Sequence, residues 1–170
     1  MSDVFTKSKR SEVMSRIRSR GNKDTELALA RLLRAHKITG WRRHALIAVE
    51  GRKSKVEGKT HSGARPSSLG SRLTVRPDFV FLKPKLAIFV DGCFWHGCPN
   101  HATKPKNNRA FWRRKLASNK KRDQVVNRTL RGAGWRVIRI WEHELPRLKA
   151  KGQTLKGKQS RVVRRIQRAL

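Results

Sequence analysis

The chain has 170 residues, enough for one compact domain with an arm or a tail, and its 43 Lys and Arg against 11 Asp and Glu give a net charge of +32. So large a positive charge repels itself, and a polyanion such as DNA or RNA relieves that repulsion. Ribosomal and packaging proteins are equally basic, so charge predicts nucleic-acid binding without predicting catalysis. An apolar run of about 18 residues is absent, as is an apolar signal core near the start, so we expect neither a membrane span nor secretion.

The first third of the chain predicts a basic arm, a helix, a strand and a loop. Residues 1–22 are polar and basic, as expected of an arm or short helix on a phosphate backbone. Asp24 has the character of an N-cap, and the leucines after it recur at helical spacing, which predicts a helix over 25–36. Residues 41–49 are expected to form a strand. Residues 51–73 are mostly Gly, Ser, Lys and Arg and predict a basic loop inserted into the domain.

The centre of the chain contains β-branched and aromatic runs that predict strands. Residues 75–82 and 86–91 are two such runs, and the Lys-Pro-Lys between them predicts a hairpin. Residues 107–131 predict a long charged helix that ends at glycines. Residues 135–143 predict a third strand. The expected inward-facing side chains of the long helix are Phe111, Trp112, Leu116 and Val126.

The last part of the chain, residues 148–170, predicts a basic C-terminal helix or tail. Its apolar stripe is expected to contain Val162, Val163, Ile166 and Leu170. The order of elements indicates an α/β fold in which helices flank a small mixed sheet. The predicted domain therefore spans residues 23–147, between the basic arm and the basic helix.

Two aspartates lie within or at the end of predicted strands, in a chain that has few acidic residues. Asp78 lies in Arg-Pro-Asp-Phe-Val, and Asp91 ends the run Ile-Phe-Val-Asp. Carboxylates on neighbouring strands hold Mg²⁺ together with a substrate phosphate, although aspartates at strand ends also form turns.

Residues 91–101 read Asp-Gly-Cys-Phe-Trp-His-Gly-Cys-Pro-Asn-His and concentrate metal-ligating side chains in a short segment. Cys93, Cys98 and His101 suit tetrahedral Zn²⁺, and His143 at the end of the third strand is a candidate fourth ligand. The alternative is a pair of free thiols beside a surface histidine. The local density of ligands favours zinc, and His96 need not be one of its ligands.

GCFWHGC, preceded by RPDFVF and followed by FW, NKKRD and GWRVIRIWEHE, resembles the very-short-patch mismatch-repair endonucleases, the Vsr-type family. The resemblance runs from about Lys9 to about Leu145 and includes the start SKRSEVMSRIRSRGNKDTE. It implies a restriction-endonuclease-like fold, a structural zinc site and Mg²⁺-dependent nicking of DNA beside a T·G mismatch. A longer loop before Arg76 and a higher charge distinguish this chain from the family pattern.

The resemblance also implies roles for single residues. Asp78 matches the aspartate that ligates Mg²⁺, and Val90 falls where a backbone carbonyl is a second ligand. His96 matches the catalytic histidine and Asp123 the aspartate that supports it. Glu26 matches a helix glutamate near the active site.

Further residues match in the same loop and helix. Asp91 either joins the metal ligands or contacts His96. The residues that fall at or near the structural zinc positions are Cys93, Cys98, His101 and His143. Phe94, Trp95 and Trp112 match aromatics that wedge into the base stack beside the mismatch, where mispairing has already weakened stacking. For Trp112 the alternative is an ordinary core tryptophan.

The sequence thus predicts a Mg²⁺-dependent and zinc-containing endonuclease that nicks one strand of duplex DNA. The expected protein is a monomer in a bacterial-type cytoplasm, associated with the nucleoid, with double-stranded DNA and repair proteins as partners. The alternatives are a related nuclease that cuts a specific unmismatched site in homing, phage or defence biology, and a basic DNA-binding protein without catalysis.

Overall fold

The computed structural model describes residues 8–9, 12, 25–50, 72–103, 105, 107–146 and 158–170. The predicted arm over 1–22 lies almost wholly outside these residues, as do positions 51–71 of the predicted insertion. Along the chain the elements are α2 (Glu26–Ala35), β1 (Trp41–Arg43), β2 (Ile47–Glu50), β3 (Arg72–Val75), β4 (Phe79–Phe81), β5 (Leu86–Asp91), α3 (Arg109–Gly132), β6 (Arg136–Trp141), the 3₁₀ turn η1 (Glu142–Glu144) and α4 (Lys158–Gln167).

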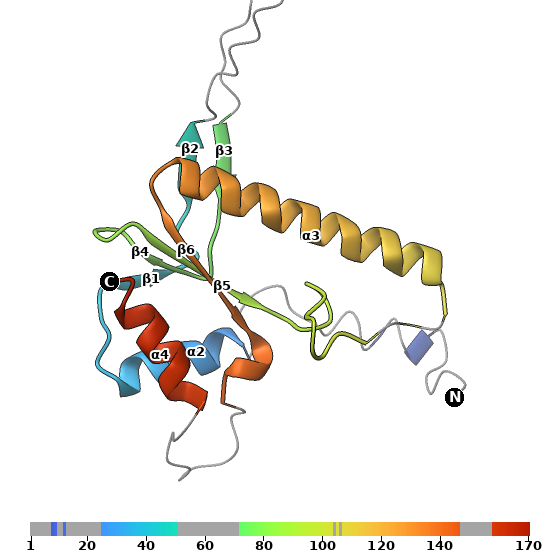
Figure 1. Cartoon of the computed structure of the whole chain (residues 1–170), viewed down its shortest axis with the longest axis horizontal. Helices are drawn as coiled ribbons and strands as arrows, with labels where there is room; N and C mark the ends of the chain where they lie inside the picture. The colour runs from blue at the N-terminus through green and yellow to red at the C-terminus, as the bar shows by residue number, and fades with distance from the viewer. Residues whose placement is uncertain are drawn as a thin grey trace, which may run out of the picture.

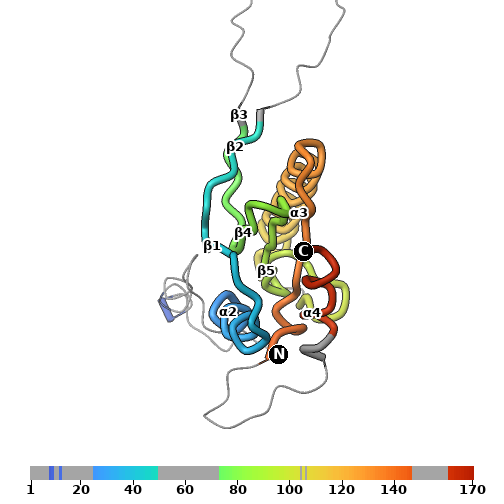
Figure 2. Tube along the Cα trace, turned by 90° about the vertical axis from the view of Figure 1, so that its left-hand side faces the viewer, coloured from blue at the N-terminus to red at the C-terminus, as the bar shows by residue number. Residues whose placement is uncertain are grey.

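The main sheet has four strands in the order β1-β4-β5-β6 and is mixed. Strand β4 runs antiparallel to β1 and to β5, which confirms the predicted hairpin, while β5 and β6 are parallel. Parallel neighbours need a long crossover connection, and α3 supplies it. A separate ribbon of β2 and β3 extends away from α2 and α4, as both views show (Figure 1, Figure 2).

The sheet separates two apolar clusters, because neighbouring side chains on a strand point to opposite faces. Phe79, Leu86 and Ile88 face α2 and α4, whereas Val80 and Ala87 lie in a second cluster with α3 and the ribbon. Figure 1 shows α3 on one side of the sheet and the other two helices on the opposite side. The predicted α/β fold with a small mixed sheet is confirmed.

Two of the predicted strands are interrupted. The expected strand over 41–49 breaks at His44, whose φ of 53° lies in the left-handed region, so β1 ends before it and β2 begins after it. The expected strand over 75–82 breaks at Arg76–Asp78, where Pro77 has no N–H for a strand ladder. At the first break the chain leaves the main sheet for the ribbon, and at the second it returns to the main sheet. Strand β3 begins at Arg72, inside the range predicted for the insertion.

The three helices confirm the predicted periodicity, with exceptions near their ends. The residue before α2 is Thr25, whose side chain makes no capping hydrogen bond; Asp24 lies outside the described residues. Phe111 was expected to face inward and is 53% exposed, and Leu170 is 45% exposed. In α4 the buried residues Val162, Val163 and Ile166 pack in the core beside α2. Among the helices of the described residues, none is long and apolar enough to cross a membrane.

Candidate active site and metal-binding clusters

The predicted functional residues gather where β5 and β6 end, which we call the site end of the sheet. Asp91 is the last residue of β5 and pairs with Trp141, the last residue of β6. Because β4 is antiparallel to β5, its first residue lies opposite Ile88, so Asp78 before β4 reaches the same end. The backbone N–H of Val90 donates to Asp78 Oδ2 at 2.7 Å.

Glu26, His44 and Asp78 form a Glu/His/Asp cluster in which one possible ligand atom from each lies within 4.8 Å of the other two. Glu26 is buried at the start of α2, with its Oε2 atom 2.9 Å from Nε2 of His44. Arg43 Nη2 also donates to Glu26 Oε2, at 2.5 Å. His44 was not among the residues singled out from the sequence, since a histidine after two arginines in an expected strand has no distinctive pattern.

Asp78 is the member of this cluster whose charge has the poorest compensation. The pKa of Asp78 is raised to about 6, mainly by burial and also by the carboxylate of Glu26, while the hydrogen bond from Val90 acts in the opposite direction. A buried carboxylate next to a second carboxylate gains stability from a nearby cation. The donor set, two carboxylates and an imidazole, therefore fits a divalent metal ion.

His96 lies in a second group of charged residues, the histidine network. Its Nδ1 atom is 2.6 Å from Asp123 Oδ2 and 3.7 Å from Asp91 Oδ1. Asp123 comes from the middle of α3, so the helix brings the carboxylate to the loop after β5. Of the two alternatives for Asp91, the geometry places this buried carboxylate with His96 and outside the Glu/His/Asp cluster.

Arg139 on β6 joins the two aspartates of the histidine network. Its Nε and Nη2 atoms donate to Asp91 at 2.6 and 2.8 Å, and Nη2 also lies 2.9 Å from Asp123 Oδ1. Burial works against the guanidinium charge, but the pKa of Arg139 is raised because the two carboxylates outweigh that effect. The sequence shows Arg139 only as one of two arginines in a strand that is otherwise apolar, and it does not reveal the partner of that arginine.

Cys93, Cys98, His101 and His143 form a Cys/His cluster with all four ligand atoms within 4.8 Å. Nδ1 of His143 is 3.2 Å from Sγ of Cys93 and 3.7 Å from Sγ of Cys98, and Nδ1 of His101 is 3.8 Å from Sγ of Cys98. Ligands around tetrahedral Zn²⁺ lie roughly 3.5 Å apart, given its bond lengths. Burial raises the pKa of the Cys93 thiol, as does Cys98, so a cation would help to hold Cys93 as a thiolate. The donor set fits zinc.

Phe94, Trp95, Phe111 and Trp112 form an aromatic cluster beside the histidine network. The rings of Phe94 and Trp112 are 5.1 Å apart, and those of Trp95 and Trp112 are 5.9 Å apart. Trp112 is half-buried and belongs to neither apolar cluster of the described residues. The cluster has an exposed edge, at Phe111.

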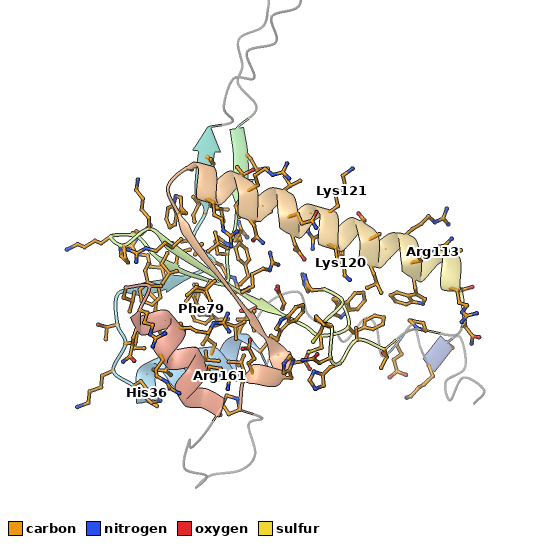
Figure 3. All side chains as sticks on the ribbon, in the orientation of Figure 1. His36, Phe79, Arg113, Lys120, Lys121 and Arg161 are labelled. Atoms are coloured by element: carbon orange, nitrogen blue, oxygen red, sulfur yellow. The ribbon has the colours of Figure 1, made fainter. Side chains whose placement is uncertain are left out.

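Helix α3 supports the loop that contains His96. The buried side chain of Asn119 donates to the backbone carbonyl of Trp95 at 3.0 Å. Gly97 has a φ of +62°, a backbone conformation that favours glycine, whereas a Cβ there would displace only the flexible end of the Lys120 side chain. In Figure 3, Lys120 points from α3 toward this loop and Lys121 points to the opposite side. Sequence reasoning did not identify Asn119, whose contact is with a distant backbone atom.

Comparisons with known proteins show which family the sequence resembles. The family model described as DNA mismatch endonuclease Vsr matches residues 60–104. The type II nicking enzyme V.NaeI of Lentzea aerocolonigenes is 53% identical over 76 residues, which are 45% of this chain and 46% of that protein. DNA mismatch endonuclease Vsr of Escherichia coli K12 is 40% identical over 68 residues, 39% of this chain and 44% of that protein.

These alignments span about half the length of the relatives, but one relative aligns over most of both chains. The type II nicking enzyme V.NmeAIP of Neisseria meningitidis serogroup A is 32% identical over 147 residues, which are 85% of each protein. Identity over that length, together with the matched family model, confirms the resemblance noted in the sequence. The chain belongs to the Vsr family of DNA endonucleases.

Proposed function

We propose that this protein is a Mg²⁺-dependent endonuclease that nicks one strand of duplex DNA beside a T·G mismatch. The single observation that carries the proposal is the 2.6 Å contact between His96 Nδ1 and Asp123 at the same end of the sheet as the Glu/His/Asp cluster. A protein that only bound DNA would gain nothing from an imidazole–carboxylate pair next to buried acids. Family membership supports the reaction class.

Asp78, together with the backbone carbonyl of Val90, is proposed to hold Mg²⁺, with Glu26 beside it. When bound, the ion supplies Lewis-acid stabilisation of the charge that develops on the scissile phosphate. The hydrogen bond from Val90 to Asp78 fixes one carboxylate oxygen and leaves the other for a ligand. Buried surroundings strengthen these electrostatic interactions relative to water.

His96 is proposed as the general base that removes a proton from the attacking water. Asp123 accepts the Nδ1–H of His96, which sets the tautomer and leaves Nε2 as the basic atom. Asp91 is a positioning residue in this proposal, because it contacts Arg139 and the edge of His96. The guanidinium of Arg139 forms ion pairs with both aspartates.

The Cys/His cluster is proposed to hold a structural Zn²⁺ in a restriction-endonuclease-like domain over residues 23–147. Zinc there would join the loop after β5 to η1, and would thus fix the positions of His96 and the aromatic cluster without taking part in hydrolysis. The N-terminal arm, the insertion over 51–73 and the basic C-terminal helix are proposed as further parts of a monomer in a bacterial-type cytoplasm. Their partner is duplex DNA, with repair proteins as additional partners.

The aromatic cluster is proposed to wedge into the base stack at the mismatch. Phe94 contacts Trp95 and Trp112 edge to face, as Phe111 contacts Trp112, and the cluster has an exposed edge at Phe111. A mispaired step costs less to unstack than a matched one, by a few kcal/mol at most. The wedge therefore favours mismatched DNA without excluding matched DNA.

The decisive experiment is Mg²⁺-dependent nicking of two duplexes that differ only in a T·G or a T·A pair. We expect one nick beside the mismatch, and a rate about 10²–10⁴-fold lower for His96→Ala. Equal cleavage of both duplexes would favour an endonuclease for an unmismatched site, which the name "nicking enzyme" of several relatives also fits. Tight binding without cleavage of either duplex would favour the non-catalytic alternative.

A further inference from the structure

His44 is held at the Glu/His/Asp cluster by an unusual backbone conformation. Its φ of 53° is uncommon for any residue other than glycine and is retained where the surrounding structure compensates the cost. The compensation includes the His44 backbone N–H, which donates to the carbonyl of Asp78 at 3.2 Å. The same bond ties the break after β1 to the residue that precedes β4.

The side chain of His44 reaches the carboxylates from this position. Its Nε2 atom is 2.9 Å from Glu26 Oε2, and all three possible ligand atoms of the cluster lie within 4.8 Å of one another. Adjacent ligands of a six-coordinate ion lie roughly 3 Å apart for bond lengths near 2.1 Å. A small rotation of the side chains would therefore place all three around one ion.

The charges of the cluster favour a dication. Arg43 neutralises one of the two carboxylates through its contact with Glu26, and the other, Asp78, remains poorly compensated. A neutral imidazole adds a ligand without adding charge. Glu26 and His44 are 6% and 24% exposed in their side chains, so their interactions are only weakly screened by water.

We propose that His44 is a nitrogen ligand of the catalytic cation, and that it gives this enzyme a preference for Mn²⁺ over Mg²⁺. Carboxylate oxygens suit both ions, but an imidazole favours a transition metal, and Mg²⁺ retains its water in preference to nitrogen. The inference rests on the proposed function, which assigns a cation to Asp78. It goes beyond that function by adding a ligand and a metal selectivity.

The test measures metal binding to the full-length protein without DNA. One equivalent of Zn²⁺ is added first, which the Cys/His cluster takes because thiolates hold zinc better than carboxylates do. Mn²⁺ binding is then followed by the electron paramagnetic resonance signal of the free ion, and Mg²⁺ binding by its displacement of Mn²⁺. The wild type should bind Mn²⁺ at least about tenfold more tightly than Mg²⁺.

The variant His44→Gln keeps a side chain that can hydrogen-bond Glu26 but removes the imidazole. It should weaken Mn²⁺ binding about tenfold or more and Mg²⁺ binding no more than about twofold. His44→Asn is a second variant, because asparagine tolerates a positive φ and is too short to reach the cluster. His36→Gln is the matched control: His36 is exposed at the end of α2 and appears in Figure 3 far from the loop after β5.

Each outcome distinguishes the inference from the proposed function. If Asp78→Asn abolishes Mn²⁺ binding while both His44 variants bind it like the wild type, His44 only orients Glu26 and the inference is overturned. If Asp78→Asn also binds Mn²⁺ normally, the cation assignment of the proposed function fails as well. Mg²⁺-dependent nicking by a wild type without Mn²⁺ preference would leave the proposed function intact and refute the selectivity.

Discussion

The Cys/His cluster and the Glu/His/Asp cluster both suit divalent metal ions, but they differ in chemistry and in origin along the chain. Three of the four possible ligands of the first lie within nine residues, Cys93 to His101, and burial raises the pKa of the Cys93 thiol. The ligands of the second come from α2, the break after β1 and the turn before β4. The first cluster is proposed to hold a structural ion, whereas the second is proposed to hold the ion that takes part in the reaction.

The largest effect should come from breaking the Cys/His cluster. Cys98→Ser removes a buried thiolate ligand, and we expect loss of bound zinc and of roughly 5 kcal/mol or more of the free energy of unfolding. Metal analysis and urea unfolding measure the two quantities. Asn100→Ser, an exposed change in the same loop, is the control. A Cys98→Ser protein as stable as the wild type would remove the structural role of this cluster.

Disrupting the Glu/His/Asp cluster should nearly abolish the reaction and leave the fold intact. Asp78→Asn removes several kcal/mol of transition-state stabilisation by the metal, which lowers the nicking rate about 10³-fold. Because this change does not affect the Lys and Arg that contact phosphates, the dissociation constant for DNA should stay within about threefold. Single-turnover nicking and a binding titration measure the two. Nicking at the wild-type rate would refute the assignment of Asp78.

The histidine network provides a carboxylate pair whose charge is compensated, in contrast to Asp78. Arg139→Met leaves Asp91 and Asp123 without their shared cation, and should cost roughly 3 kcal/mol of the free energy of unfolding. Arg136→Met, an exposed change on the same strand, should cost little. Urea unfolding of the pair measures the difference, and equal costs would mean that Arg139 does not stabilise the two carboxylates.

Arg139→Met is expected to lower the free energy of unfolding, whereas Asp78→Asn is expected to raise it. Its pKa is about 6 in the folded protein against 3.8 for the free side chain, so between these values the folded state binds more proton than the unfolded state. The free energy of unfolding therefore falls as pH rises from about 4 to about 6 and levels off above it. In Mg²⁺-free buffer, Asp78→Asn should be more stable than the wild type above pH 6, by roughly 1–3 kcal/mol.

Urea unfolding at pH 4 and pH 7.5 checks this sign. If the free energy of unfolding of Asp78→Asn exceeds that of the wild type only at the higher pH, the result supports an uncompensated charge on Asp78. Added Mg²⁺ should then stabilise the wild type and not Asp78→Asn, because only the wild type binds the ion. A variant less stable than the wild type at pH 7.5 would contradict the contrast between the two clusters.

The smallest expected effect concerns target choice. Trp112→Ala should lower the ratio of mismatched to matched nicking about tenfold, since stacking of one aromatic on a base contributes ~1–3 kcal/mol. Trp135→Ala is the matched control: Trp135 packs against the apolar cluster of α3 and the ribbon, so its loss should lower stability and leave the ratio unchanged. An unchanged ratio in Trp112→Ala would end the wedge proposal.

The sequence predicted those features that depend on nearby residues. Strand β5, the hairpin with β4 and the three helices follow from local patterns of apolar residues, and the Cys/His cluster follows from the density of ligands over 91–101. The breaks at His44 and Pro77 were missed because a β-rich run of residues does not reveal where the chain leaves one sheet for another.

Only the tertiary structure determines which charged side chains form ion pairs. Arg139 and Asp91 are 48 positions apart and come together because β5 and β6 pair in parallel across the α3 crossover. Asp123 reaches His96 because α3 lies beside the loop after β5, and His44 reaches Glu26 because β1 brings the chain back past the start of α2. The local sequence determines the conformation of each segment through its backbone preferences and the spacing of its apolar residues. The pairing of distant charged side chains depends instead on how the sheet and helices pack, because residues that are neighbours in space are far apart in the chain.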